Sequence, residues 1–472
     1  MNYLDFPTLN RMEFTRNERI KEAVMKSFNI VIVGGGPAGV TAAISARNTY
    51  PEKSIALIRK EQVPMIPCGI PYILHSLESI DQNILPDAPL HNKNVEIIID
   101  EVIGRNDHVL ELASGEKIQY EKLVLATGSK VFIPPIEGID LEGVFYVKKE
   151  KTYLETFKEN ALKAQKIVII GGGFIGLEVA DELLKAGKQV TIIEKLDHLL
   201  PLAMDAEFGD FLAEKLREKK AQVLTGTTVK KIDGSQKVQG VILEDGTKID
   251  ADMVIVSAGY RPNLALAQKL GLDYNDRYGI LVDEYLRTSE KDIFAVGDCA
   301  AKRNCYTGEF TKIMLASTAM AEGRLAGSNL YDIKVIRKFI GILGSFSTKI
   351  AGVALGVSGM TERDAKALGM DYVVGTTETF DRHPGKLPGA SKIYLKLIFA
   401  RYSHTLLGGE VRGGDSVGEI VNILSVMIQK QMTDMEIDTL QIGTHPLLTA
   451  SPIAYPIVNA TADAIVKWLH LK

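Results

Sequence analysis

The sequence predicts an α/β protein made of two Rossmann-like dinucleotide-binding domains and a C-terminal α+β domain. The main observation is that a G-x-G-x-x-G fingerprint occurs twice, each time between a β-branched apolar run and a helical stretch. The second is that no fingerprint follows residue 335, although strand-like and helical runs continue. The length of 472 residues allows about three domains at roughly 150 residues each.

These landmarks divide the chain into segments. We expect an N-terminal extension at residues 1–28, in which Arg16–Ser27 is a candidate for a short amphipathic helix. The first dinucleotide-binding domain is expected to combine residues 29–148 and 273–334. The second is expected at 149–272, and the C-terminal domain at 335–472.

Composition narrows the class of protein. A hydrophobic content of 46% and a charged content of 24% are ordinary for a soluble globular protein. The net charge of −4 gives no attraction to nucleic acid or an anionic membrane, so neither partner is expected. Three cysteines (Cys68, Cys299 and Cys305) are too few for a disulfide framework, which favours a reducing, cytoplasmic location. We expect no membrane span, no signal or transit peptide and no metal site.

The first fingerprint begins at Gly34, directly after the apolar strand at 29–33. Gly34 permits the tight turn, Gly36 lets the backbone approach a pyrophosphate, and Gly39 lets the following helix pack against the strand. Pro37 and Ala38 complete the loop. The helix expected at 40–47 then directs its N-terminus toward the phosphate charge.

An acidic residue that binds the adenosine ribose is expected after the second strand, at 55–58. The chain has Arg59, Lys60 and Glu61 at that point. Three interpretations remain open. Glu61 reaches the ribose from further along the chain, Arg59 contacts the adenosine differently, or Arg59 is a solvated surface charge.

Two further strand ends carry small or acidic residues. The apolar run at 120–125 ends in Ala126, Thr127 and Gly128, and small residues there allow close approach of a cofactor. A later strand leads into Gly297 and Asp298. Asp298 either accepts hydrogen bonds from a ribityl hydroxyl or is an ordinary turn aspartate.

The second fingerprint repeats the pattern, with candidate cofactor-binding positions at Gly171, Gly173, Ile175 and Gly176. Glu194 ends the next strand near the spacing of about 20 residues expected for a ribose-binding acid. A carboxylate there accepts from a free 2′-hydroxyl and repels a 2′-phosphate, which favours NADH over NADPH.

Other features of the second unit are less specific. Glu178 opens the helix expected at 177–186. A β-meander is predicted at 225–252, with turns at Asp233-Gly234 and Asp245-Gly246. An apolar strand at 253–258 then leads to Gly259, a further cofactor-binding candidate.

Cys68 is the candidate redox residue. It lies in Pro-Cys-Gly-Ile-Pro-Tyr, where a loop is predicted to enter a helix at Ile70–Leu77. Backbone N–H groups at a helix N-terminus favour a reactive thiolate. The alternative is a small buried hydrophobic residue. The apolar run at 63–67 would by itself raise the thiol pKa.

The chain resembles the flavin-dependent disulfide reductases in a set of motifs that occur in the same order. The motifs are the two fingerprints, Ala126-Thr127-Gly128, the Arg261-Pro262-Asn263 segment and Gly297-Asp298. The resemblance covers roughly residue 29 to the C-terminus. It implies that the first fold binds FAD, that the second binds NADH, and that the C-terminal domain forms a homodimer. It also implies that Asp298 binds the ribityl chain and that Glu178 lies beside the nicotinamide.

The cysteine pattern points to a subgroup. The chain lacks the paired C-x-x-x-x-C and C-x-x-C motifs. A single cysteine before Gly-Ile-Pro-Tyr resembles the branch with coenzyme A disulfide reductase, NADH oxidase, NADH peroxidase and polysulfide reductases. The histidine of the oxidases and peroxidases corresponds to Pro37, which weakens oxygen and peroxide chemistry. The serine usual four residues before the cysteine is Pro64.

The resemblance also gives two C-terminal residues a possible role. His445 or Tyr455 would act as proton donor to a leaving thiolate in the partner subunit, or would be a structural interface residue. A basic cluster, comprising Arg382, Lys386 and Lys392, would either meet phosphates of coenzyme A or form a solvated face.

We therefore expect an FAD-dependent, NADH-oxidising reductase of small disulfides, persulfides or polysulfides that acts through Cys68. An NADH oxidase that reduces oxygen at the flavin, and a flavoprotein that donates electrons to a protein partner, are the alternatives.

Overall fold

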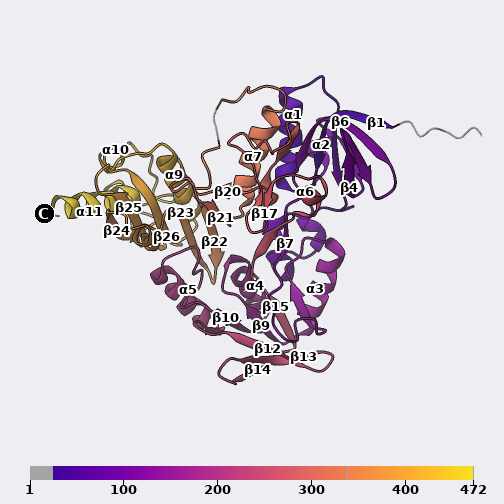
Figure 1. Ribbon diagram of the computed structural model, residues 1–472. Helices are drawn as coiled ribbons and strands as arrows, with labels where there is room; N and C mark the ends of the chain where they lie inside the picture. Colours follow the sequence, from indigo (N-terminus) through magenta and orange to yellow (C-terminus); the bar gives the residue numbers. More distant parts are fainter. Residues whose placement is uncertain (1–24, 337–338, 471–472) are drawn as a thin grey trace, which may run out of the picture.

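The computed structural model describes residues 25–336 and 339–470 and consists of three sheet-centred units (Figure 1). The helix considered at Arg16–Ser27 lies mostly outside the described residues. Its last two positions are wrong, because strand β1 (Lys26–Val33) already begins there. Within the described ranges, no helix combines the length and apolar character needed to cross a membrane.

The first unit is a seven-stranded sheet with the order β3-β2-β1-β6-β5-β4, and β19 pairs with the C-terminal end of β6, past the residues that pair with β5. Its central strands are parallel and their apolar residues are buried on both faces, as expected for a sheet covered by helices. Helices α1 (Pro37–Thr49) and α7 (Ala316–Ser328) pack against each other beside it. The other elements of this unit are β2 (Ile55–Arg59), α2 (Ala88–His91), β3 (Glu96–Ile99), β4 (Val102–Asn106), β5 (Val109–Leu112), β6 (Lys117–Leu125) and β19 (Ile293–Ala295).

The second unit is a five-stranded parallel sheet with the order β11-β10-β9-β15-β8. A three-stranded meander extends it. The turn predicted at Asp245-Gly246 is confirmed, but the one at Asp233-Gly234 is wrong, because both residues end a strand. The elements are β8 (Val144–Tyr146), α3 (Lys151–Lys163), β9 (Lys166–Ile170), α4 (Phe174–Lys185), β10 (Gln189–Ile193), α5 (Ala206–Glu218), β11 (Gln222–Leu224), β12 (Val229–Gly234), β13 (Val238–Leu243), β14 (Lys248–Asp250) and β15 (Met253–Val256).

The chain passes between the first two units through paired strands. β7 (Ser129–Val131) and β16 (Tyr260–Pro262) run antiparallel to each other at the crossing. β8 lies before residue 149 but belongs to the second sheet, and α6 (Ala265–Lys269) lies before residue 273 but contributes to the core of the first unit. The chain therefore enters the second unit a few residues before residue 149. It returns to the first unit before residue 273, by the start of α6.

The C-terminal unit is an antiparallel sheet with the order β22-β23-β26-β25-β24, with α9 and α11 packed against it. This arrangement agrees with the predicted α+β unit. Its elements are β22 (Phe346–Ile350), β23 (Val353–Gly359), α8 (Glu362–Ala367), β24 (Tyr372–Phe380), β25 (Lys392–Ala400), β26 (Leu406–Gly413), α9 (Val417–Gln429), α10 (Asp434–Asp438) and α11 (Pro456–His470). Two short strand pairs follow β16 in the sequence, and Ile280 of the first pair belongs to the core of the first unit. They are β17 (Tyr274–Asn275) with β18 (Gly279–Ile280) and β20 (Lys302–Arg303) with β21 (Phe310–Thr311).

A buried charged cluster joins the second and C-terminal units. The Asp205 backbone N–H donates to Glu410 Oε1 at 2.7 Å, and Lys396 Nζ lies 3.0 Å from Asp205 Oδ2. Lys396 also pairs with Glu207 and Glu362. Burial and the neighbouring Asp205 raise the pKa of Glu410 well above its usual range. Burial and the Asp205 charge therefore both favour the neutral form of Glu410.

Replacing Glu410 with glutamine is expected to raise the thermal midpoint relative to wild type more at pH 8 than at pH 5. Glu410 has a raised folded pKa, so the stability that it contributes is present below about pH 4.5 and is lost as pH rises toward the folded value. Glutamine escapes this loss, which amounts to about 1.4 kcal/mol for each unit of pKa shift. Thermal unfolding at the two pH values measures the difference, and an equal difference at both would contradict it.

Candidate active site

The Cys68 loop contains two short 3₁₀ turns, at Pro67–Gly69 and Pro71–Leu74. The α-helix predicted at Ile70–Leu77 is wrong. Prolines at positions 67 and 71 each open a turn, because a fixed φ suits the first helical position, but the second proline cannot donate the hydrogen bond that would carry one continuous helix through. Cys68 is therefore not at the N-terminus of a helix that could stabilise its thiolate.

Contacts from distant residues hold this loop. The side chain of Asn83, 2% exposed, donates to the Ile66 carbonyl at 3.0 Å, and the Ile66 N–H donates to the Asn83 carbonyl at 2.9 Å. A Cβ added at Gly69 would lie 1.9 Å from Asn83 Oδ1. Buried Glu182 of α4 accepts from the N–H and hydroxyl of Ser76 at 2.7 and 2.9 Å. Sequence reasoning missed Asn83 and Glu182, and only Glu182, one helical turn after Glu178, carried a signal that could have found it.

The Cys68 side chain has solvent contact, and charged groups from both dinucleotide-binding units act on its sulfur. Burial by the surrounding loop raises the pKa of the Cys68 thiol, and the negative charges of Glu178 and Asp298 raise it further, whereas Lys149 lowers it. The protein groups thus favour the protonated thiol. The thiolate that the sequence analysis expects therefore stays a prediction, which these side chains oppose.

Glu178 lies on α4 and contacts the C-terminal unit. Thr348 of β22 donates its hydroxyl to Glu178 Oε1 at 2.8 Å. Burial raises the pKa of the Glu178 carboxyl, and the Thr348 hydrogen bond opposes that effect. Nearby, Phe174 of α4 meets Phe346 of β22 edge-on, with ring centroids 4.6 Å apart. Helix α4 therefore links the Cys68 loop to the C-terminal sheet.

The alkylation rate of Cys68 by iodoacetamide should rise with pH around a midpoint above that of an unperturbed cysteine. Glu178→Gln removes the largest charged contribution, so its midpoint should lie lower than that of the wild type. A Cys305→Ser background removes the other partly exposed thiol, whose pKa burial raises to about 11. Stopped-time alkylation followed by mass spectrometry measures the profile, and a Glu178→Gln midpoint equal to or above wild type would contradict the prediction.

The first fingerprint loop has the geometry that its glycines predict. Gly34 has φ +121°, and a Cβ there would lie 2.1 Å from the Ala126 carbonyl oxygen. A Cβ at Gly39 would meet the Gly34 carbonyl at 2.0 Å, so strand and helix pack too closely for a side chain. At Gly36 an added Cβ meets nothing within 4 Å, and no side chain caps α1 there. This loop, with Pro37 and Ala38 opening α1, leaves open space for an anion at the helix N-terminus.

Arg59 is buried at 4% exposure and forms a two-pronged ion pair with Asp87, through hydrogen bonds of 2.5 and 2.6 Å. Its Nε donates to the Glu61 carbonyl at 2.9 Å, and its side chain packs against Gly35. The interpretation as a solvated charge is therefore wrong. Arg59 therefore supports the first fingerprint loop by packing against Gly35. The contact of Arg59 or Glu61 with adenosine stays a prediction.

The small-residue strand end and the Gly297-Asp298 turn come together at the edge of the first sheet. Thr127 donates its hydroxyl to the Asn263 carbonyl at 3.1 Å, and the Asn263 N–H donates to Gly128 at 2.9 Å. Asp298 lies in a 3₁₀ turn at Gly297–Cys299, where Ser129 donates to Oδ2 at 2.7 Å. Lys149 Nζ lies 3.7 Å from the same oxygen.

The second fingerprint repeats the geometry of the first. Gly171 has φ +114°, and a Cβ there would lie 2.4 Å from the Ser257 carbonyl oxygen, whereas Gly173 is open. Ile175 and Gly176 lie in the first turn of α4. Glu194 follows β10, and its carboxylate accepts from the N–H groups of Gly172 and Leu196 at 2.7 and 2.8 Å. Gly259, with φ +97°, faces open space.

The C-terminal candidates lie apart from this arrangement within one protomer. His445 is exposed, and its Nδ1 accepts from the Leu447 N–H at 3.2 Å. Tyr455 packs against the C-terminal core, and burial raises the pKa of its hydroxyl. No contact within residues 25–336 and 339–470 joins either side chain to Cys68. Their catalytic role remains a prediction about a partner subunit.

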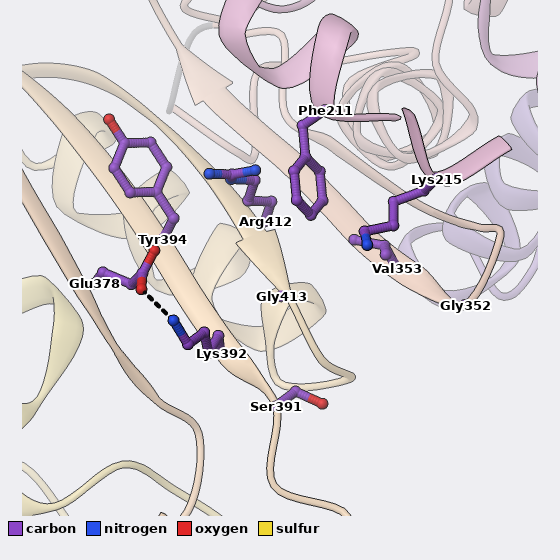
Figure 2. Close-up of a pocket in the computed structure, with 10 residues that line it drawn as sticks. All are labelled: Phe211, Lys215, Gly352, Val353, Glu378, Ser391, Lys392, Tyr394, Arg412 and Gly413. Atoms are coloured by element: carbon purple, nitrogen blue, oxygen red, sulfur yellow. Dashed lines mark hydrogen bonds and ion pairs between the residues drawn. The ribbon is translucent and has the colours of Figure 1, made fainter. Parts of the chain in front are cut away.

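A groove with a cavity volume of about 360 Å³ lies between α5 and the C-terminal sheet (Figure 2). Arg412 lies between two rings there, 3.8 Å from the centre of Phe211 and 5.0 Å from that of Tyr394. Lys392, from the predicted basic cluster, pairs with Glu378 at 2.8 Å. The groove contains neither a cysteine nor a fingerprint residue, so it is separate from the Cys68 site.

Two family models match this architecture. Residues 28–323 match the pyridine nucleotide-disulphide oxidoreductase model, and residues 346–453 match the dimerisation domain of the same family. The chain belongs to the pyridine nucleotide-disulphide oxidoreductases. Members of this family are enzymes that use FAD and NAD(P)H, so the sequence-based predictions of family, fold class and cofactors are confirmed.

Individual relatives span most of the chain. An NADH oxidase of Methanocaldococcus jannaschii is 32% identical and covers 93% of this chain and 98% of its own length. An NAD(P)H coenzyme A polysulfide/persulfide reductase of Pyrococcus horikoshii is 31% identical, covering 83% and 88%. The structure of an NAD-dependent persulfide reductase from A. fulgidus, 31% identical, matches with a TM-score of 0.85 over 93% of this chain and 83% of the other.

Both fingerprint loops fit the cofactors of this oxidoreductase family. Gly36 and Gly173 are the N-caps of α1 and α4, and the space beyond each is free of protein atoms within 4 Å of an added Cβ. The free N–H groups of the two helices point where a pyrophosphate would lie. Gly34, Gly36 and Gly39 would hold FAD, while Gly171, Gly173 and Gly176 would hold the nicotinamide nucleotide.

Proposed function

We propose that this oxidoreductase uses NADH to reduce small disulfides, persulfides or polysulfides through Cys68. The observation that carries the proposal is that charged groups from different parts of the fold act on one accessible sulfur, that of Cys68. These groups are Glu178 of the second unit, Asp298 of the Gly297–Cys299 turn, and Lys149. Cys299 is buried and Cys305 is half-buried, so among the three cysteines Cys68 is the accessible one. Relatives named as polysulfide and persulfide reductases support this substrate class.

The chemistry at Cys68 is thiol–disulfide exchange. The Cys68 thiolate attacks one sulfur of the acceptor, so that a new S–S bond forms, the acceptor S–S bond breaks, and one thiolate leaves. Two electrons from NADH then cleave the mixed disulfide and release the second thiolate. Bound FAD supplies the two-electron relay between NADH and sulfur. Since the protein raises the thiol pKa, we infer that the thiolate arises mainly as the product of this reduction.

The preference for NADH rests on Glu194. Its two oxygens already accept two backbone N–H groups, which fixes the carboxylate at the strand end and leaves lone pairs for a ribose hydroxyl. The same negative charge would repel the 2′-phosphate of NADPH. Lys195, next in the chain, weakens that discrimination.

We also infer a homodimer in the reducing cytoplasm. The chain carries the family's dimerisation domain, and this domain exposes large apolar side chains, including Val426 at 58%, Leu448 at 72% and Ile453 at 87%. A partner's surface would cover them. In such a dimer His445 and Tyr455 would approach the partner's flavin, where either is a candidate proton donor. Three free cysteines agree with a reducing compartment.

The second candidate is an NADH oxidase. Relatives with this name include those of Methanocaldococcus jannaschii and, at 31% identity, Enterococcus faecalis. Pro37 stands where the resemblance places the acid/base histidine of the oxidases, which is why we rank oxygen second.

An anaerobic NADH titration of the purified holoenzyme tests the proposal. If Cys68 is isolated in an oxidised form, more than one equivalent of NADH per flavin is needed to bleach the flavin absorbance, and Cys68→Ser needs one. Turnover with coenzyme A disulfide and polysulfide, against oxygen uptake at an electrode, then separates the two candidates. Complete bleaching of the wild type by one equivalent, with oxygen uptake as the main activity, would overturn the proposal in favour of the oxidase.

A further inference from the structure

A buried ion pair lies beneath the turn that presents Asp298. Lys302 is 3% exposed and Glu322 is 1% exposed, and Lys302 Nζ lies 2.7 Å from both oxygens of Glu322. Glu322 also accepts from the Gly297 N–H at 2.7 Å, and Lys302 donates to the Gly297 carbonyl at 2.8 Å. The pair therefore satisfies both backbone polar groups of one glycine.

Burying this ion pair costs folding free energy, so its presence points to a role other than stability. Moving two charges out of water costs several kcal/mol per ion, and buried pairs are often replaced by apolar residues without loss of stability. Within the described residues, the side chains of Lys302 and Glu322 form hydrogen bonds to each other and to Gly297 and to no other residue. The two charges thus hold the peptide groups on both sides of the Gly297 Cα, because its N–H and its carbonyl belong to successive peptide planes.

The fixed peptide is placed against the first fingerprint helix. Gly297 has φ +73°, and a Cβ there would lie 2.8 Å from the Ala38 Cβ at the start of α1. Glu322 lies on α7, and the next residue, Gly323, packs so closely on α1 that an added Cβ would lie 2.6 Å from the Ala38 carbonyl. The turn, α7 and the N-terminus of α1 are therefore closely packed against one another.

We propose that the Lys302–Glu322 pair positions the Gly297-Asp298 turn for FAD, and that it sets the affinity for the flavin. Asp298 follows the fixed peptide directly, and Ser129 and Lys149 orient its carboxylate from the other side. With the pair removed, the Gly297 carbonyl still accepts from the Ala300 N–H, but the Gly297 N–H loses its acceptor, and the backbone that directs Asp298 is held less firmly. The inference does not depend on which acceptor the enzyme reduces.

The test compares FAD binding by apoproteins, followed by the quenching of flavin fluorescence. Lys302→Met/Glu322→Leu replaces the pair with apolar groups and should weaken FAD binding by about tenfold or more, the loss expected for hydrogen bonds to charged groups. Lys302→Arg keeps the charge and the donors and should stay within about threefold of wild type. NADH binding to the second unit should be unchanged in both.

A matched control is Lys122→Met, which removes the partner of Asp292, a mostly buried ion pair in the same unit that does not touch the turn. It should lower the thermal midpoint without changing FAD affinity. Glu322→Gln provides a second variant where the double substitution does not fold, and it should weaken FAD binding while NADH still binds. A folded double variant with FAD affinity within twofold of wild type, or a Lys122→Met variant that loses FAD equally, would overturn the proposal.

Discussion

Cys68→Ser should lower turnover with coenzyme A disulfide or polysulfide by at least about a thousandfold, the usual size of the loss when a nucleophile is removed. Serine keeps the size of the side chain, and the loop is held by Asn83 and Glu182 rather than by the sulfur. The rate at which NADH reduces the flavin should therefore stay within about twofold of wild type, because that half-reaction does not use Cys68. Stopped-flow reduction and steady-state turnover measure the two steps separately.

Cys305→Ser is the matched control for this variant. Cys305 is half-buried, and its pKa of about 11 leaves it protonated at neutral pH. Its replacement should leave turnover within about twofold of wild type, because a protonated thiol is a poor nucleophile. If Cys68→Ser retained wild-type turnover, reduction would proceed at the flavin or at another group, and the disulfide mechanism would be wrong.

The two dinucleotide-binding folds could be predicted because their signals are local. In each fingerprint, the strand, the glycines and the helix are contiguous, and the glycine spacing follows from short contacts within the loop, such as that between Gly39 and the Gly34 carbonyl. The same kind of signal located Glu194 at a strand end and Asp298 in a turn after a strand. Confirmed elements are therefore those in which neighbouring residues determine the backbone.

The surroundings of Cys68 could not be predicted because they depend on contacts distant in sequence. Glu182 reaches Ser76 from another domain, and Thr348 reaches Glu178 from a third. The helix expected after Cys68 failed because a second proline, Pro71, starts a new turn only three residues later. Arg59 was ambiguous for a similar reason, since its partner Asp87 lies 28 residues away.

The electrostatics of Cys68, the proposed redox residue, show the same division between local and distant contacts. The local argument supplied a favourable helix N-terminus, whereas the three-dimensional structure supplies burial and two carboxylates that raise the thiol pKa. A raised pKa lowers the thiolate fraction of Cys68 at neutral pH and with it the expected rate of alkylation. In the proposed mechanism, reduction of the mixed disulfide then supplies the thiolate.

Gly36→Val and Gly173→Val should each impair the binding of a different cofactor. Each residue has an extended backbone that valine adopts without strain, and an added Cβ meets no protein atom within 4 Å. The new side chain instead enters the space proposed for a pyrophosphate. Gly36→Val should therefore be isolated folded but without FAD, whereas Gly173→Val should retain FAD and show a dissociation constant for NADH raised about a hundredfold or more, a loss of roughly 3 kcal/mol.

Absorbance at the flavin band and stopped-flow reduction by NADH measure these two effects, and Gly443→Val, at a similarly open position of the C-terminal unit, controls for adding a side chain. The control should keep the FAD content of each subunit and the NADH dissociation constant within about twofold of wild type, because Gly443 belongs to neither fingerprint loop. If Gly36→Val kept FAD and lost NADH binding, the assignment of the two folds would be reversed. The paired variants work because the two loops are nearly the same in geometry, so that any difference between them reports the cofactor and not the stability of the loop.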